Sequence, residues 1–238
     1  MRNPSVSTGP PSLLWTTFRR SLTIGRTYIV VGIVYVLVLS VALSLSPGSS
    51  FDSAFPIFLP IFGVLGSMGS LMVFSNDRTK GVFEYLIAYG FSPRGLFINV
   101  LLASLLIETV TLALLVGIGL AIFVASGHAI SLPLLTALSV YSVPMSYASS
   151  AFASLMGMIW TSLAKPWTGL SSPIGLVPFV GIAPSLLTLA LVAFLAIQGF
   201  ANVDLVVGAV VLGVLTLVVA LLSELDRLLP RERLLSPV

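Results

Sequence analysis

The stretch SNDRTKGVFEYLIAYGFSPR, residues Ser75 to Arg94, is a short polar segment between two long apolar runs. Charges of both signs gather in it, and its middle part, Gly81 to Tyr89, is long enough for about two to three turns of helix. On such a helix Val82, Leu86 and Tyr89 share one face. The segment is too short and too charged to cross a bilayer. It therefore predicts a short amphipathic helix outside the membrane, between two membrane-spanning helices.

The composition of the whole chain is that of an integral membrane protein. Of its 238 residues, 57% are hydrophobic and only 8% are charged, whereas a soluble domain carries about 25% charged residues. Mean hydropathy is +1.12. The apolar runs are continuous and lack the alternation of an outer-membrane barrel, so the predicted fold class is all-α. The net charge of +3 comes from basic residues scattered over several loops, and this pattern is not that of a nucleic-acid-binding protein.

The start of the chain predicts a helix that lies at the membrane surface. Residues 1–11 are rich in Pro, Ser and Gly, and we expect a disordered leader there. Residues 12–26 follow an amphipathic pattern, with Trp15 and Phe18 on one side and Arg19 and Arg20 on the other. Such a helix suits the headgroup region, where it contacts membrane lipid.

Six candidate spans follow between residues 28 and 222, and a polar tail covers residues 223–238, all within one transmembrane domain. The spans are residues 28–45, 55–74, 96–124, 134–163, 170–197 and 203–222. Several exceed the roughly 20 residues that a crossing needs, so they must tilt, kink or project from the membrane. The fourth contains Pro144. The fifth contains Pro173, Pro178 and Pro184, and it is either one kinked helix or a helix followed by a re-entrant piece near residues 187–200.

The basic residues predict the orientation. With six spans, all 11 Lys and Arg residues fall on one side, together with both termini. The opposite loops, residues 46–54, 126–131 and 198–202, carry no Lys or Arg, and the charged residues and histidine on that side are Asp52, His128 and Asp204. Because positive residues accumulate on the cytoplasmic side, we expect a multi-pass protein of the cell membrane with both termini in the cytoplasm.

No group of residues predicts catalysis or a metal site. The chain has two lysines, Lys80 and Lys165, and neither follows the glycine pattern of a P-loop. Its single histidine, His128, lies in a loop, and there is no cysteine, so no metal cluster is expected. We therefore expect a protein that is not an enzyme and holds no cofactor.

Two features inside the spans have both a structural and a functional interpretation. Glu108 is an acidic residue within the third span, with no basic residue in any span to pair with it. It either holds neighbouring helices together through a hydrogen bond or forms a site for substrate or protons. The second span carries a set of small and flexible residues that either pack closely against another helix or line an apolar pathway or dimer interface. These are Gly63, Gly66, Met68, Gly69 and Met72.

The polar segment also resembles a known motif. Gly81-Val82-Phe83-Glu84-Tyr85-Leu86-Ile87, followed by Phe91-Ser92-Pro93-Arg94, is similar to the loop after the second span in type-2 permease subunits of ATP-binding-cassette exporters. Two positions depart from that pattern. Gly90 stands where a proline is usual, with Pro93 displaced, and Asn99 replaces a lysine often found early in the third span. The overall plan of an amphipathic helix, six spans and small outer loops is also similar.

The resemblance implies a partner. Gly81 to Tyr89 would be a coupling helix that docks on a separate ATPase subunit, which binds ATP and Mg²⁺. The implied complex has two ATPase subunits and two permeases, either identical or different, with a pathway between the permeases. The candidate contacts to the ATPase are Arg78, Lys80, Gly81, Phe83, Glu84, Tyr85 and Tyr89. The cargo expected from the apolar, Met- and Gly-containing pathway is hydrophobic or amphipathic. The alternative function is an ion-gradient-driven transporter or channel that uses Glu108.

Overall fold

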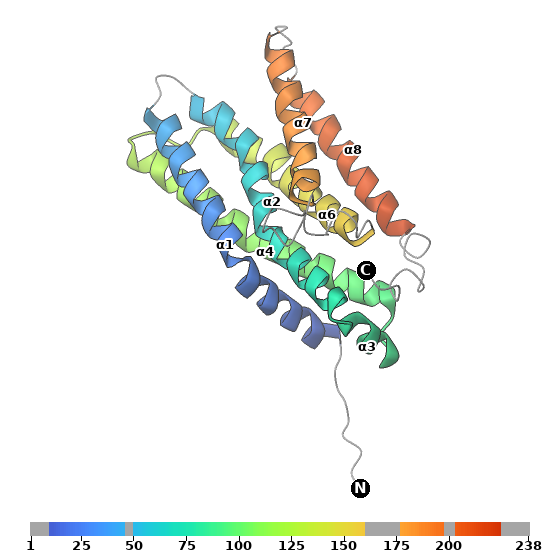
Figure 1. Ribbon diagram of the computed structural model, residues 1–238. Coiled ribbons are helices and arrows are strands. Elements are labelled where there is room, and N and C mark those ends of the chain that lie inside the picture. Colours follow the sequence, from blue (N-terminus) through green and yellow to red (C-terminus); the bar gives the residue numbers. More distant parts are fainter. Residues whose placement is uncertain (1–9, 46–49, 160–176, 198–202, 225–238) are drawn as a thin grey trace, which may run out of the picture.

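The computed structural model describes residues 10–45, 50–159, 177–197 and 203–224, and in these ranges the chain is all-α (Figure 1). The helices are α1 (Pro10–Leu45), α2 (Ser50–Thr79), α3 (Val82–Ala88), α4 (Pro93–Ala125), α5 (Leu132–Ala137), α6 (Val143–Ile159), α7 (Val177–Ile197) and α8 (Val203–Ser223). A π-helical turn, η1 (Leu138–Ser142), joins α5 to α6.

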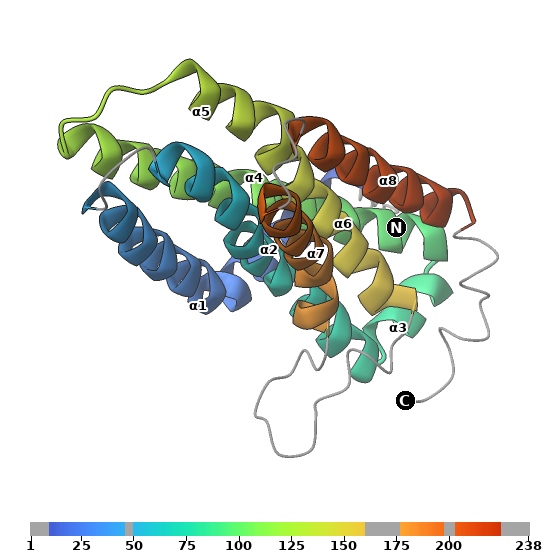
Figure 2. The same cartoon turned by 90° about the horizontal axis from the view of Figure 1, so that it is seen from above.

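The long helices form a bundle around α2. This helix contacts α1, α4, α6 and α7, and the view from above places it among them (Figure 2). In the described part of the chain, four helical segments are long and apolar enough to cross a membrane: Leu13–Leu45, Ala54–Arg78, Pro93–Ala125 and Val206–Ser223. The predicted class of a helical membrane protein with several spans agrees with this architecture.

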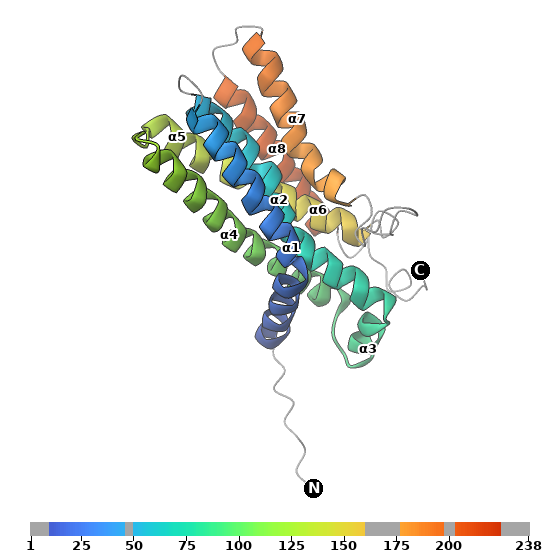
Figure 3. The ribbon, with the colours of Figure 1, turned by 60° about the vertical axis from the view of Figure 1, so that its left-hand side comes forward.

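The first helix differs from the prediction of a separate interfacial helix. Residues 12–26 are helical, but they continue without a break into the predicted first span, and α1 has 36 residues. The helix also begins at Pro10, inside the segment expected to be a disordered leader; residues 1–9 lie outside the described ranges. Proline is favoured in the first helical turn because its missing N–H has no partner there in any case. Figure 3 shows that the first turns of α1 lie at an angle to the rest of the helix.

The other predicted boundaries shift by smaller amounts. The second helix begins at Ser50, inside the loop predicted over residues 46–54, and ends at Thr79, so it includes the start of the polar segment. The predicted fourth span is helical from Leu132, and its kink is the π-helical turn before Pro144, whose ring nitrogen has no hydrogen to donate. Within the described part of the fifth span, α7 is a single helix from Val177 to Ile197 with Pro184 inside it. A re-entrant break after residue 187 is therefore wrong.

Glycine lets α1 and α2 touch backbone to backbone. A Cβ atom built on Gly25 of α1 would lie 2.8 Å from Cα of Gly69 in α2. A Cβ on Gly69 would clash with the carbonyl oxygen of Ser21. Close approach of this kind needs small residues, which agrees with the interpretation of Gly69 as a packing residue.

We predict that Gly69→Ala destabilises the protein by about 1–3 kcal/mol, because backbone atoms cannot move aside as a flexible side chain can. Thermal unfolding in mild detergent would show the lowered midpoint. Gly117→Ala in α4 is the matched control, since a Cβ there meets nothing within 4 Å. That variant should be neutral or slightly more stable, as alanine favours helix. Equal midpoints for the two variants would contradict the proposed contact.

Candidate functional site

Two tight turns fix α3 between α2 and α4. Gly81 at the start of α3 has φ +70°, and Gly90 after its end has φ +93°. Both values lie in the left-handed region that glycine enters without a steric penalty. Ser92 then caps α4, with its side chain accepting a hydrogen bond from the backbone N–H of Gly95 at 3.1 Å. The short helix predicted over residues 81–89 is thus confirmed, and its direction is set by short, ordered connections.

Phe83 anchors α3 to the bundle. Its side chain is only 6% exposed, and its ring centroid lies 5.1 Å from that of Phe74 in α2 and 6.4 Å from that of Phe97 in α4. The aromatic pair at the ends of α2 and α4 thus selects Phe83 as the buried side chain of α3. Phe83, which the resemblance gave as a candidate partner contact, is thus buried within this chain.

The opposite face of α3 is exposed and carries both aromatic and charged side chains. Tyr85 is 69% exposed and Tyr89 is 74% exposed, and their ring centroids lie 5.5 Å apart. Glu84 on the same helix and Lys80 just before it are exposed as well. Exposed tyrosines are enriched in protein–protein interfaces, where they supply area at a low cost in side-chain entropy. Of the other candidate contacts, Gly81 and Arg78 are half-buried.

An ion pair holds the start of α1 against the end of α2. The guanidinium of Arg20 donates two hydrogen bonds to the carboxylate of Asp77, at 2.8 and 2.5 Å. Asp77 is buried, whereas Arg20 is partly exposed. Two-pronged pairs of this type fix orientation as well as distance. The pairing links residues 57 positions apart, and no local sequence pattern predicts it.

The described basic residues gather at the α3 end of the bundle. They lie in the N-terminal half of α1 and around the connections of α3, and Figures 1 and 3 place the start of α1 at the same end of the bundle as α3. They are Arg19, Arg20, Arg26, Arg78, Lys80 and Arg94. The other end holds Asp52, which accepts a hydrogen bond from Ser131 at 2.6 Å, and the exposed loop residue His128. This separation agrees with the predicted segregation of charge.

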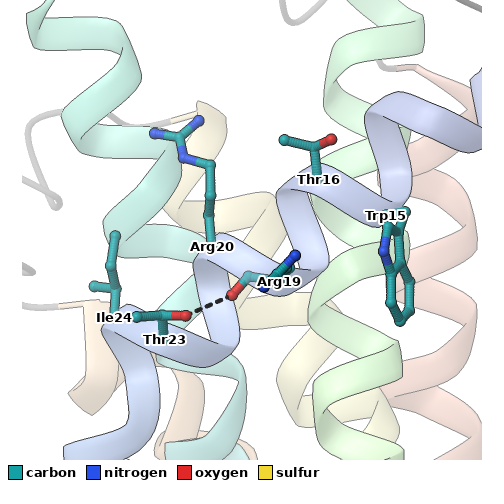
Figure 4. A pocket seen from close by; sticks show the side chains of 6 residues that line it. All are labelled: Trp15, Thr16, Arg19, Arg20, Thr23 and Ile24. Carbon is teal, nitrogen blue, oxygen red and sulfur yellow. Dashed lines mark hydrogen bonds between the residues drawn. The ribbon is translucent and has the colours of Figure 1, made fainter.

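A shallow groove of about 390 Å³ runs along the first turns of α1 (Figure 4). Its lining residues are Trp15, Thr16, Arg19, Arg20, Thr23 and Ile24. Most of them belong to the polar side predicted for this helix. The hydroxyl of Thr23 donates to the backbone carbonyl of Arg19 at 2.9 Å, and the side chain of Arg19 is exposed at the groove.

Glu108 lies in the centre of the bundle. Its side chain is 0% exposed, and its Oε1 atom accepts a hydrogen bond from the hydroxyl of Ser146 in α6. Oε2 has no hydrogen-bond partner among the described residues. Gly63 of α2 faces this pair so closely that a Cβ on it would clash with both side chains. The carboxyl group is therefore enclosed where α2, α4 and α6 meet.

The remaining pathway candidates pack within this one chain. Gly66 contacts the side chain of Thr111 in α4, and Gly69 contacts α1. Met68 is completely buried in a cluster with Val64, Leu71 and Ala153, and Met72 packs against it. Their close helix packing agrees with the structural interpretation of this set.

Buried hydroxyl groups around Glu108 are functional candidates that the sequence interpretation missed. Serines recur every fourth residue along one side of η1 and α6, and all of them are buried: Ser142, Ser146, Ser150 and Ser154. Ser154 shares a hydrogen bond of 2.9 Å with Ser104 of α4. Their spacing in an otherwise apolar run is the signal that would have revealed one polar face of a membrane helix.

Comparison of the chain with protein-family models, curated proteins and solved structures gives no match. Among the described residues, no group of three or more His, Cys, Asp or Glu side chains is placed to hold a metal ion. Two sites therefore stand out from the geometry alone: the exposed face of α3 and the enclosed carboxyl of Glu108.

We predict that Phe83→Ala frees α3 from the bundle. Loss of a buried phenylalanine costs about 3 kcal/mol, so opening of α3 should become roughly a hundredfold more frequent. Hydrogen–deuterium exchange of the α3 amides measures this directly. Tyr85→Ala on the exposed face is the control and should leave their exchange nearly unchanged. Unaltered exchange in Phe83→Ala would mean that the turns alone hold α3.

Proposed function

We propose that this chain is the membrane-spanning subunit of an ATP-driven transporter, energised by a separate ATPase subunit that docks on α3. The proposed family is that of the type-2 permeases of ATP-binding-cassette exporters. The proposed arrangement has six spans, cytoplasmic termini in the cell membrane, and two permeases with two ATPases. The transport direction is outward, and the cargo is hydrophobic or amphipathic.

The observation that carries the proposal is the construction of α3. A short helix protrudes at the basic end of the bundle, with Phe83 fixed inside and Glu84, Tyr85 and Tyr89 exposed outside. Helices that are as short as this one are marginal in water on their own. Its burial against α2 and α4 gives it a fixed shape on which a soluble partner can dock without first ordering a loop.

The same construction suits the transmission of force. Closure of an ATPase dimer must move membrane helices, and α3 is joined to both α2 and α4 through two tight turns. The rings of Phe74, Phe83 and Phe97 keep α3 from moving independently of these helices. Because α2 also contacts α1, α6 and α7, a displacement of α3 reaches most of the bundle.

We predict that Glu84→Lys releases the ATPase subunit while the chain remains folded. Glu84 is exposed, and charge reversal at a docking surface replaces attraction by repulsion, which should weaken the complex at least tenfold. The tagged chain would be recovered from its native membranes in mild detergent, and ATP hydrolysis would be measured in the eluate. Wild type should elute with an ATPase, and the variant without it.

Glu224→Lys is the matched control, because Glu224 is also exposed and lies at the end of α8 rather than on α3. It should retain the ATPase. A wild-type chain that elutes alone, with no ATP hydrolysis, would contradict the proposed function. An ATPase that stays bound to Glu84→Lys would keep the function and exclude Glu84 as the contact.

A second candidate function is an ion-gradient-driven transporter or channel, and the burial of Glu108 is the observation that favours it. The two functions predict different effects of the Glu108→Gln substitution on transport. In the ATP-driven transporter, the neutral isostere should keep assembly and change transport by no more than about twofold, since Glu108 lies between packed helices. Flux assays in vesicles measure this. Complete loss of transport in a folded variant, with flux that follows an ion gradient, would favour the second function.

A further inference from the structure

Several buried oxygen atoms around Glu108 have no hydrogen-bond partner among the described residues. They are Oε2 of Glu108 and the hydroxyl oxygens of Thr111 and Ser150. All three side chains are 0% exposed. A buried polar atom without a partner costs free energy, so several together indicate that something else binds them.

These atoms are close to one another. Glu108 and Thr111 lie one turn apart on α4, so their side chains are neighbours. Ser146 donates to Oε1 of Glu108, and Ser150, one turn further along α6, faces the same carboxyl without full hydrogen-bond geometry. On the third side, α2 offers no side chain at all, because Gly63 faces the carboxyl and Gly66 faces Thr111. Oxygen atoms from two helices thus converge in a cradle against the glycines of α2, where there is no room for a Cβ atom.

The carboxylate of Glu108 also has no positively charged side chain beside it among the described residues. An ionised carboxylate buried at membrane depth is very unfavourable unless a positive charge neutralises it. No Lys or Arg side chain among the described residues pairs with Glu108, and Arg20 pairs with Asp77 instead. A proton would also neutralise the carboxyl, so it is the competing ligand that the test has to distinguish from a cation.

We propose that Glu108, Thr111, Ser146 and Ser150 form a binding site for one sodium ion in the core of the bundle. Carboxylate and hydroxyl oxygens are hard ligands, which alkali and alkaline-earth cations prefer. One carboxylate balances one positive charge, whereas a divalent cation would leave a net charge in the bundle. The closeness of Gly63 to the carboxyl, where a Cβ would lie 2.6 Å from Oε1, favours a small cation over potassium.

A cation here connects two helices and lies against a third. It joins the oxygens of α4 and α6 in front of the glycine face of α2, and so it strengthens the packing on which the bundle depends. The site stands on this packing and is independent of the proposed transport function, because its occupancy is measured on the isolated chain.

The first test measures binding directly. The chain, purified in mild detergent, is equilibrated with radioactive sodium in choline chloride at constant ionic strength. We expect saturable binding of about one ion per chain, accompanied by a rise in the unfolding midpoint of at least about 2 °C. Potassium should give a smaller rise at the same concentration.

Variants locate the site. Glu108→Gln keeps the shape of the side chain but removes its charge, and we expect it to abolish both sodium binding and the sodium-dependent rise. Thr111→Val and Ser150→Ala should each weaken sodium binding at least tenfold. These two variants test the site if Glu108→Gln does not fold. Glu84→Gln, an exposed carboxylate on α3, is the matched control and should bind like wild type.

Three results would overturn the proposal. They are the absence of saturable sodium binding by wild type, unchanged binding in Glu108→Gln, and stability that rises only on acidification and ignores sodium at neutral pH. The last would make a proton the ligand of Glu108.

Discussion

The close approach of other helices to α2 is the constraint on which the rest of the structure depends. Large side chains would hold α1 and α4 away, but Gly25 meets Gly69 backbone to backbone, and the side chain of Thr111 lies against Gly66. In a bilayer the lipid tails are as apolar as the side chains, so close packing and internal hydrogen bonds provide much of the association between helices. Ser104 and Ser154 add such a bond between α4 and α6.

The two ends of the bundle are held by different means. At the basic end, the Arg20–Asp77 pair joins α1 to α2, and Phe83 joins α3 to both α2 and α4. At the other end, the rings of Phe51 and Phe123 stack with centroids 4.2 Å apart. Stacked aromatic rings and a bidentate ion pair both fix the relative orientation of the helices that they join, whereas glycine contacts fix only the distance between helices. The bundle therefore has a defined geometry where α3 is attached.

Sequence patterns predict the elements of this fold better than its contacts. Long apolar runs determine where the helices lie, and Gly81 and Gly90 bracket α3, because both signals are local. Phe83 was not identified from the sequence as the buried side chain of α3, because its ring partners Phe74 and Phe97 lie on other helices. The Arg20–Asp77 pair was missed for the same reason. Glu108 stood out from its unusual residue type, but the serines around it become a site only when α4 and α6 meet.

The two candidate sites share the same helices, and this has a physical consequence. The α3 helix is attached to the ends of α2 and α4, and the oxygen cradle of Glu108 lies further along the same two helices, where α6 joins them. Helices packed this closely can slide past one another by small amounts. The polar cluster around Glu108, which joins α4 to α6, resists such sliding at its own position along the two helices. A force applied at α3 then moves α2, α4 and α6 together rather than distorting α3 alone.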